Sequence, residues 1–382
     1  MRRKITMAAT AGALALGLAA CGGGGAGSPE PGASGNVDKG DITVGVAMPT
    51  ETSERWIADG DAVKSGLEAL GYKVDLQYAG DDIPTQTQQI DQMITSGADV
   101  LIIASIDGTA LTSQLENAAA QNIPVIAYDR LIRDSENVDF YVTFDNFAVG
   151  VAQGTALLKG MGLLDAAGTE VPNMTGPYNI ELFAGSPDDN NAGFFFEGAM
   201  SVLEPFVDGG TLVVKSGQTD FDTVATLRWS QEAAQKRMED LLTSTYSDGS
   251  KLAGVLSPYD GISRGIITAL QGVGQGPTIA DGLPIVTGQD AEIASVKLIN
   301  DDVQFSTIFK DTRKLAEQAV VSAQSFLAGE EPEANDTETY DNGVKVVPSF
   351  LLDSDIVYKD NIQSLLIDSG YWTEDQVASG QA

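Results

Sequence analysis

The chain has 382 residues, enough for two domains, and it carries 54 acidic against 22 basic residues, a formal charge of -32. This charge argues against sequence-independent binding to nucleic-acid phosphates, which needs clustered Lys and Arg. Because the chain contains no His, Ser-His-Asp and Cys-His catalysis and His-ligated zinc sites are excluded.

The first twenty residues have the composition of an export signal. Residues 1–4 are positively charged, and residues 5–16 form an apolar segment that is too short to span a bilayer as a finished anchor. Cys21, the only Cys, follows Leu-Ala-Ala, and this tetrapeptide resembles the lipobox of bacterial lipoproteins, in which the Cys is acylated. We predict a lipoprotein signal peptide over residues 1–20 and a lipid on Cys21; the alternative is an ordinary signal peptide followed by a chance Cys.

The segment after Cys21 differs in composition from the rest of the chain. It is rich in Gly, Ser and Pro and has no apolar periodicity, which predicts a flexible tether over residues 21–40. With a single Cys no disulfide framework exists. From Ile42 onward no apolar run is long enough to cross a membrane.

Residues 100–133 show the pattern of the folded part. Residues 100–104 form an apolar run of strand length, Asp107 is placed to cap a helix, and Leu and Ala recur at helical spacing over residues 111–119. A second buried strand is predicted over residues 125–128. A strand, a helix and a strand in this order predict two parallel strands.

The same alternation over the rest of the chain predicts an α/β fold with two successive halves, each built on a mostly parallel sheet. The other expected strands cover residues 42–48, 73–78, 140–144, 178–183, 212–215, 254–256, 285–287 and 305–309. The other expected helices cover residues 56–70, 85–95, from about 146, 192–203, 231–242, 262–270, 293–299 and 312–327.

Polar residues follow the predicted strands in both halves, and in open α/β sheets ligands bind at this edge. They are Asp129-Arg130, Asp145-Asn146, residues 188–191, Tyr259-Asp260, Asp290 and Lys310. If the two sheets face each other at this edge, these residues line one cleft. Carboxylates, amides and guanidinium groups satisfy sugar hydroxyls, and Trp56 and Trp229 suit the apolar faces of a sugar ring. These residues also have purely structural interpretations: Asp129 and Arg130 as a salt bridge, and the two Trp as core residues.

The chain resembles the periplasmic sugar-binding proteins of ABC importers, of the multiple-monosaccharide-binding type and close to xylose-binding proteins. The resemblance covers nearly all of residues 42–372. It rests on the motifs AMPTETSERW, DLQYAGDDIPTQ, VLIIASIDGT, IAYDRLIR, FDNFAVG, ELFAGSPDDNNA, LSPYDGIS, GQDAE and STIFKDTR.

The resemblance implies two Rossmann-like lobes, the type I periplasmic binding protein fold, joined by a three-strand hinge with a sugar held between them. We expect the N-terminal lobe to cover residues 41–147 plus 310–334 and the C-terminal lobe residues 148–309 plus 335–382. The sugar-binding residues that the resemblance implies are Arg55, Asp129, Arg130, Asp189, Asn191, Asp260, Asp290 and Lys310, with Trp56 and Trp229 as the stacking pair.

At two points the sequence differs from related families, and these differences bear on the expected sugar specificity and on metal binding. Tyr259 stands where xylose- and ribose-binding relatives have Asn, which favours broader sugar specificity. The D-x-D-x-D-G calcium loop of glucose/galactose-binding relatives is missing from the sequence, so we expect neither a metal nor a cofactor.

The predicted function is therefore an exported, lipid-anchored binding protein without enzymatic activity, at the outer face of the cytoplasmic membrane or in the periplasm. It captures an aldopyranose such as galactose, glucose, arabinose or xylose and, as a monomer, delivers it to the permease of an ABC importer.

Three other functions would use some of the same features. A sugar sensor that presents its ligand to a membrane receptor would have the same sequence features as a transport subunit. A glycosidase with Asp188 and Asp189 at the scissile bond lacks any feature that selects a proton-donating acid. A sugar-responsive repressor needs a basic helix-turn-helix at the N-terminus, where this chain has a signal segment and a tether.

Overall fold

The computed structural model describes residues 39–174 and 176–382. The predicted signal peptide, Cys21 and the tether up to residue 38 lie outside the described residues. None of the helices in the described part is both long and apolar enough to cross a membrane.

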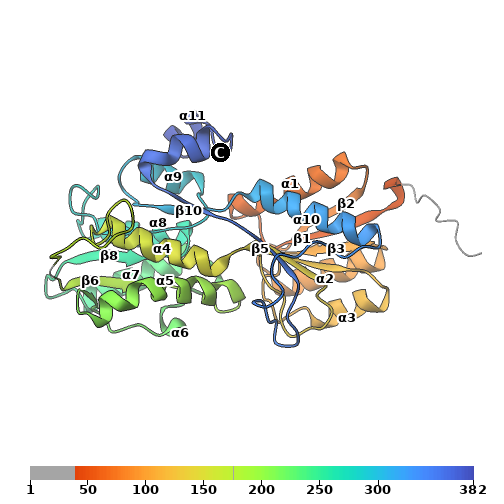
Figure 1. The fold of residues 1–382 in the computed structure, drawn as a ribbon, viewed down its shortest axis with the longest axis horizontal. Helices are drawn as coiled ribbons and strands as arrows, with labels where there is room; N and C mark the ends of the chain where they lie inside the picture. The colour runs from red at the N-terminus through yellow and green to blue at the C-terminus, as the bar shows by residue number, and fades with distance from the viewer. Residues whose placement is uncertain (1–38, 175) are drawn as a thin grey trace, which may run out of the picture. The chain divides into compact units, whose positions relative to one another are not determined.

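The first sheet has six parallel strands in the order β11-β5-β4-β3-β1-β2 (Figure 1). Their bounds are β1 Thr43–Met48, β2 Lys73–Tyr78, β3 Val100–Ile103, β4 Val125–Tyr128, β5 Phe140–Phe144 and β11 Ser349–Leu352. Successive strand residues point to opposite faces, so Val46 packs with helices α1 (Glu54–Ala69) and α10 (Thr312–Leu327), and Ala47 packs with α2 (Ile83–Thr95) and α3 (Thr112–Ala120). The buried runs predicted at β3 and β4 reflect burial on both faces of the sheet.

The second sheet has four parallel strands in the order β7-β6-β8-β9. Their bounds are β6 Tyr178–Leu182, β7 Leu212–Val214, β8 Leu252–Leu256 and β9 Ile285–Val286. Helices α4 (Asn146–Gly160) and α5 (Asn190–Asp208) contribute to one core, and α7 (Gln231–Ser244) and α8 (Asp260–Gly272) to the other.

Smaller elements complete the second half. A two-stranded antiparallel sheet pairs β10 (Thr307–Phe309) with β12 (Asp355–Val357), and a single bridge from Gln289 to Ile308 joins it to the chain after β9. The remaining helices are α6 Phe221–Val224, α9 Ile293–Asn300 and α11 Glu374–Ser379, with short turns η1 Lys39–Asp41, η2 Leu227–Trp229, η3 Lys359–Asn361 and η4 Gln363–Ile367.

The chain passes between the two groups of strands three times. It leaves the first sheet between β5 and α4, returns between β10 and α10, and leaves again between β11 and β12. This topology is the type I periplasmic binding protein fold with three connecting segments, as the resemblance implied. The layered α/β fold is confirmed, and every strand and helix predicted up to residue 327 is present with its ends shifted by a few residues.

Two local predictions differ from the structure. The predicted lobes placed residues 335–382 in the second half, but β11 pairs with β5 of the first sheet, and only the chain from β12 onward belongs to the second group. A four-residue strand does not encode which sheet edge it joins, because pairing depends on the neighbouring strand. Asp107 does not cap α3, whose N-cap is Leu111; the Asp107 carboxylate instead accepts from the backbone N–H of Thr109, closing a turn before the helix.

Candidate functional site

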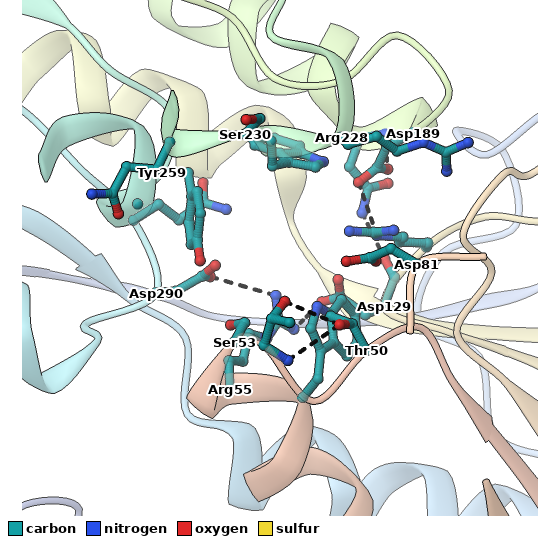
Figure 2. A pocket seen from close by; sticks show the side chains of 18 of the residues that line it. Thr50, Ser53, Arg55, Asp81, Asp129, Asp189, Arg228, Ser230, Tyr259 and Asp290 are labelled. Atoms are coloured by element: carbon teal, nitrogen blue, oxygen red, sulfur yellow. Dashed lines mark hydrogen bonds and ion pairs between the residues drawn. The ribbon is translucent and has the colours of Figure 1, made fainter. Parts of the chain in front are cut away.

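A cavity of about 390 Å³ lies where the carboxyl ends of both parallel sheets meet, within the usual size range of small-molecule sites. Figure 2 shows Arg55 and Asp129 on one side of it and Arg228 and Ser230 on the other. The predicted site residues that line this cavity are Arg55, Trp56, Asp129, Arg130, Asp189, Asn191, Trp229, Asp290 and Lys310. The structure thus brings together residues that are up to 255 positions apart in the chain, Arg55 and Lys310.

Arg55 lies at the centre of the charged side of the cavity, in the first turn of α1 directly after β1. Its Nε is 3.1 Å from an Oδ2 of Asp59, its Nη1 is 3.4 Å from Oδ1 of Asp290, and its Nη2 contacts Oδ2 of Asp129. Burial by itself lowers the pKa of this guanidinium, but the three carboxylates raise it well above its ordinary value. Arg55 is therefore a permanent cation in a buried position.

Asp129 is fixed through its backbone at the end of β4. Its φ of 59° lies in the left-handed region, which Asp adopts more readily than most residues. Its carbonyl oxygen accepts hydrogen bonds from Tyr141 Oη at 2.6 Å, Thr143 Oγ1 at 2.9 Å and Asn191 Nδ2 at 2.6 Å. Burial raises the pKa of the Asp129 carboxyl, but Arg55, Lys310 and Arg130 outweigh it and leave the pKa below its usual value. The side chain is thus an anchored carboxylate with a fixed direction.

Arg130 connects the two halves across the cavity. Its Nε is 3.2 Å from Oδ2 of Asp189, which is the N-cap of α5. Burial raises the pKa of the Asp189 carboxyl, although Arg130 opposes this shift. The guanidinium groups of Arg130 and Arg55 lie 5.1 and 4.8 Å from the ring of Trp56, within the range of cation–π contacts.

Asp290 and Lys310 close the charged side. Lys310 Nζ is 2.9 Å from Oδ1 of Asp290, which is also the acceptor for Arg55. Lys310 follows β10 at one of the three connecting segments, and its ammonium lies 5.7 and 5.5 Å from the rings of Phe144 and Phe195. We call Arg55, Asp129, Arg130, Asp290 and Lys310 the polar wall.

Three aromatic residues, Phe195, Trp229 and Tyr259, also line the cavity, and we call them the aromatic wall. The Trp229 ring meets Phe195 at 6.3 Å and Tyr259 at 6.1 Å, both edge to face. Trp229 and the residue before it have positive φ values of 55° and 58°. A Cβ atom on Gly185 would lie 2.0 Å from Cη2 of Trp229, so this ring position requires a glycine there.

Of the sugar-binding residues that the resemblance implied, Asp260 is the one that the structure does not place on the cavity. Four further residues at strand ends that were expected in the cleft do not line it either: Asp145, Asn146, Asp188 and Asn190. Asp260 is fully buried, and its carboxylate accepts from Glu292 N at 2.9 Å, Gln304 Nε2 at 2.8 Å and Thr307 Oγ1 at 3.1 Å. Burial and the nearby Glu292 raise the pKa of this carboxyl well above its usual value. Asp260 supports the loop after β9 from the side away from the cavity. Its position at a strand end is the same for a supporting residue and for a ligand contact, so the sequence alone does not separate the two roles.

Two groups beside the cavity were not predicted. The Glu292 carboxylate accepts from Ser53 Oγ at 2.8 Å, Tyr259 Oη at 2.7 Å and Arg264 Nη2 at 2.7 Å, so it joins the start of α1 to the aromatic wall. Asp59 lies under Arg55, and the only sequence signal for it is its position four residues after Arg55 on one helix face. Glu292 belongs to the GQDAE motif, but no residue pattern in that motif indicates that its carboxylate accepts three hydrogen bonds.

Residues 39–174 and 176–382 contain no group of three or more His, Cys, Asp or Glu side chains arranged to hold a metal ion.

Comparisons with known proteins identify the family of the chain. Residues 44–331 match the family model described as "Periplasmic binding protein domain". The chain is 55% identical over 340 residues, 89% of this chain and 93% of the relative, to the multiple sugar-binding periplasmic receptor ChvE of Rhizobium radiobacter. It is 35% identical over 337 residues, 88% of this chain and 93% of the relative, to the D-xylose-binding periplasmic protein of Escherichia coli.

A solved structure extends the comparison. An ABC transporter solute binding protein from Clostridium phytofermentans with bound β-D-glucose superimposes with a TM-score of 0.82 at 48% identity, over 88% of this chain and 99% of that chain. These relatives are receptors and binding proteins, a class without enzymatic activity. The sequence, the topology and the comparisons together place the chain in the periplasmic binding protein family.

Proposed function

We propose that this protein captures one monosaccharide, an aldopyranose such as galactose, glucose, arabinose or xylose, and delivers it to the permease of an ABC importer. The observation that carries the proposal is that the polar wall and the aromatic wall line the same cavity of about 390 Å³. Relatives that bind several sugars, xylose or glucose support the substrate class.

The polar wall suits the hydroxyl groups of a sugar. Each hydroxyl donates one hydrogen bond and accepts two, so it is satisfied by a carboxylate together with a guanidinium or an ammonium. Asp129 beside Arg55 and Asp290 beside Lys310 supply such pairs. Because these groups are buried and charged, each hydrogen bond to them is stronger than a bond between neutral groups.

The aromatic wall suits the ring of the same sugar. The C–H faces of a pyranose are apolar and pack flat against an indole, and the edge contacts with Phe195 and Tyr259 hold the Trp229 ring in place. Trp56 lines the cavity as well, but its ring contacts the two guanidinium groups. In this proposal Trp229 carries most of the stacking and Trp56 the smaller part.

The proposed capture involves two lobes that close on the sugar. We assign residues 41–145 and 310–352 to one lobe and residues 146–309 and 353–382 to the other, with hinges at the three connecting segments. Hydrogen bonds from Ser53 to Glu292 and from Gly108 N to Asp188 O, at 2.8 and 3.3 Å, support a closed form that direct contacts between lobes stabilise. Hinge closure of this kind is a common response to ligand binding.

The proposal also includes the place of action. The relatives are periplasmic, which supports export. A lipid on Cys21 and a tether over residues 21–40 would keep a monomeric binding protein at the membrane close to its permease. Replacing Cys21 with Ser is expected to release the protein from membranes, and a Cys21→Ser protein that still carries the lipid and sediments with membranes would contradict this part.

Calorimetric titration of the purified protein tests the substrate class. Galactose, glucose, arabinose and xylose are titrated separately, with sorbitol as the control because it has the hydroxyl groups but no ring. We expect at least one aldopyranose to bind with a Kd of about 1 µM or below, roughly -8 kcal/mol, and sorbitol to bind far more weakly. No heat and no shift in melting temperature with any of the four sugars would overturn the proposal.

A further inference from the structure

Asp59 lies directly behind the polar wall and has no access to the cavity. Its side chain is fully buried, and it is not among the residues that line the cavity. One carboxylate oxygen contacts Arg55 Nε at 3.1 Å, and the other accepts a hydrogen bond from the hydroxyl of Tyr128. Of these two hydrogen-bond partners, Arg55 is the one that lines the cavity.

The N–H donors of the Arg55 guanidinium are shared among three carboxylates, one of which is Asp59. A guanidinium has five N–H groups in one plane. Asp59 takes the one on Nε, Asp290 takes one on Nη1 and Asp129 takes one on Nη2. Two N–H groups remain, one on each Nη, and Arg55 is among the residues that line the cavity. Because the bond from Nε fixes the rotation of the plane, it also fixes the direction of the two remaining donors.

We propose that Asp59 is a positioning residue for sugar binding: its carboxylate holds the Arg55 guanidinium in the one orientation that presents two free N–H donors to the ligand. This inference rests on the function proposed above. Tyr128, at the end of β4, keeps the Asp59 carboxylate in place and links it to the strand that leads into Asp129 and Arg130 of the polar wall.

The surroundings of Asp59 make this role dependent on pH. The charged or titratable groups that face Asp59 are Arg55 on its own helix, Tyr78 on β2, Tyr128 on β4, Asp129 after β4, Lys310 after β10 and Tyr371 in the C-terminal segment. Burial raises the pKa of the Asp59 carboxyl to about 7, while Arg55 and the Tyr128 hydroxyl oppose the shift. As the pH falls through about 7, Asp59 gains a proton and loses the charge that holds Arg55.

The experiment compares sugar affinity in four proteins by calorimetry between pH 5.5 and 8.5. The probe is whichever of glucose, galactose, arabinose or xylose the wild type binds most tightly. The variants are Asp59→Asn, Tyr128→Phe and the control Asp61→Asn, which removes the same charge from an exposed position of the same helix.

The expected pattern differs for each protein. The wild type loses affinity as the pH falls through about 7, and Asp59→Asn binds about 10-fold or more weakly at pH 8 and lacks this transition. Tyr128→Phe removes a hydrogen bond that favours the charged carboxylate, so its transition moves to higher pH. Asp61→Asn follows the wild type within about two-fold.

Two results would overturn the inference, and they are distinguishable. If the wild type binds an aldopyranose and Asp59→Asn shows the same affinity and the same pH profile, Asp59 is only a structural residue. If the wild type binds none of the four sugars, the proposed function fails together with the inference. Should Asp59→Asn not fold, Tyr128→Phe decides: an unchanged transition in that variant contradicts the role of Asp59.

Discussion

The two walls of the cavity are built in opposite ways. The polar wall has little freedom, because each charge is paired with another buried charge and Asp129 is fixed by three hydrogen bonds to its carbonyl. The aromatic wall is held by shape instead: edge contacts between rings, a turn with two positive φ values and a glycine that leaves room for the indole. The comparison predicts that the first wall distinguishes sugars by their hydroxyl groups and the second binds all pyranoses alike.

Arg55→Ala should have the largest effect, because it leaves three buried carboxylates without their shared cation. Removing one partner of a buried ion pair costs about 3 to 5 kcal/mol, so we expect a lower melting temperature without sugar as well as loss of binding. Melting curves and titrations at pH 7.5 test this. Lys64→Ala, a partly exposed residue of the same helix, is the control. A normal melting temperature would contradict the ion-pair network.

Trp229→Ala should weaken binding of every pyranose by about 3 kcal/mol, since it removes the stacking surface common to all of them. Gly185→Ala tests the position of the ring without removing it, because the added Cβ would lie 2.0 Å from Cη2 of Trp229. Both variants are titrated with galactose, glucose, arabinose and xylose. Losses that differ strongly among these sugars would contradict the proposed role of the aromatic wall.

Asp129→Asn keeps the shape of the side chain and removes its charge. A hydrogen bond to a charged group contributes about 1.5 to 3 kcal/mol, so the variant should lose up to that amount for sugars whose hydroxyl Asp129 holds, and less for their epimers. The same four titrations measure this difference. An equal loss for all four sugars would mean that the polar wall does not select among hydroxyl configurations.

Ser53→Ala should have the smallest effect. It removes one of three hydrogen bonds to Glu292, and Tyr259 and Arg264 still hold that carboxylate. We expect about 1 kcal/mol weaker binding, the same for every sugar, because the bond joins the two lobes and does not touch the ligand in this proposal. Ser65→Ala, an exposed residue of the same helix, is the control. A loss that depends on the sugar would place Ser53 among the ligand contacts.

The sequence predicted the charged residues that line the cavity better than the residues that support them. Strand ends with charged residues located Asp129, Arg130, Asp189 and Asp290, because parallel strands bring their carboxyl ends to one edge. The same rule placed Asp260 on the cavity, although its carboxylate faces three donors beneath it.

The residues that the sequence missed share a physical reason. The Tyr128–Asp59 and Ser53–Glu292 hydrogen bonds join residues that are 69 and 239 positions apart, and no local periodicity indicates such pairs. The same holds for β11, whose four residues join the first sheet through pairing with β5. Local patterns predict which elements form, while these contacts between distant segments depend on the finished fold.

A crystal structure of the protein grown with the tightest-binding aldopyranose tests the central claim most directly. We predict one sugar ring in the cavity, with hydroxyl groups within hydrogen-bond distance of Arg55 and Asp129 and one C–H face against the Trp229 ring. A sugar bound elsewhere, with Trp229 and the polar wall making no contact to it, would contradict the proposed site.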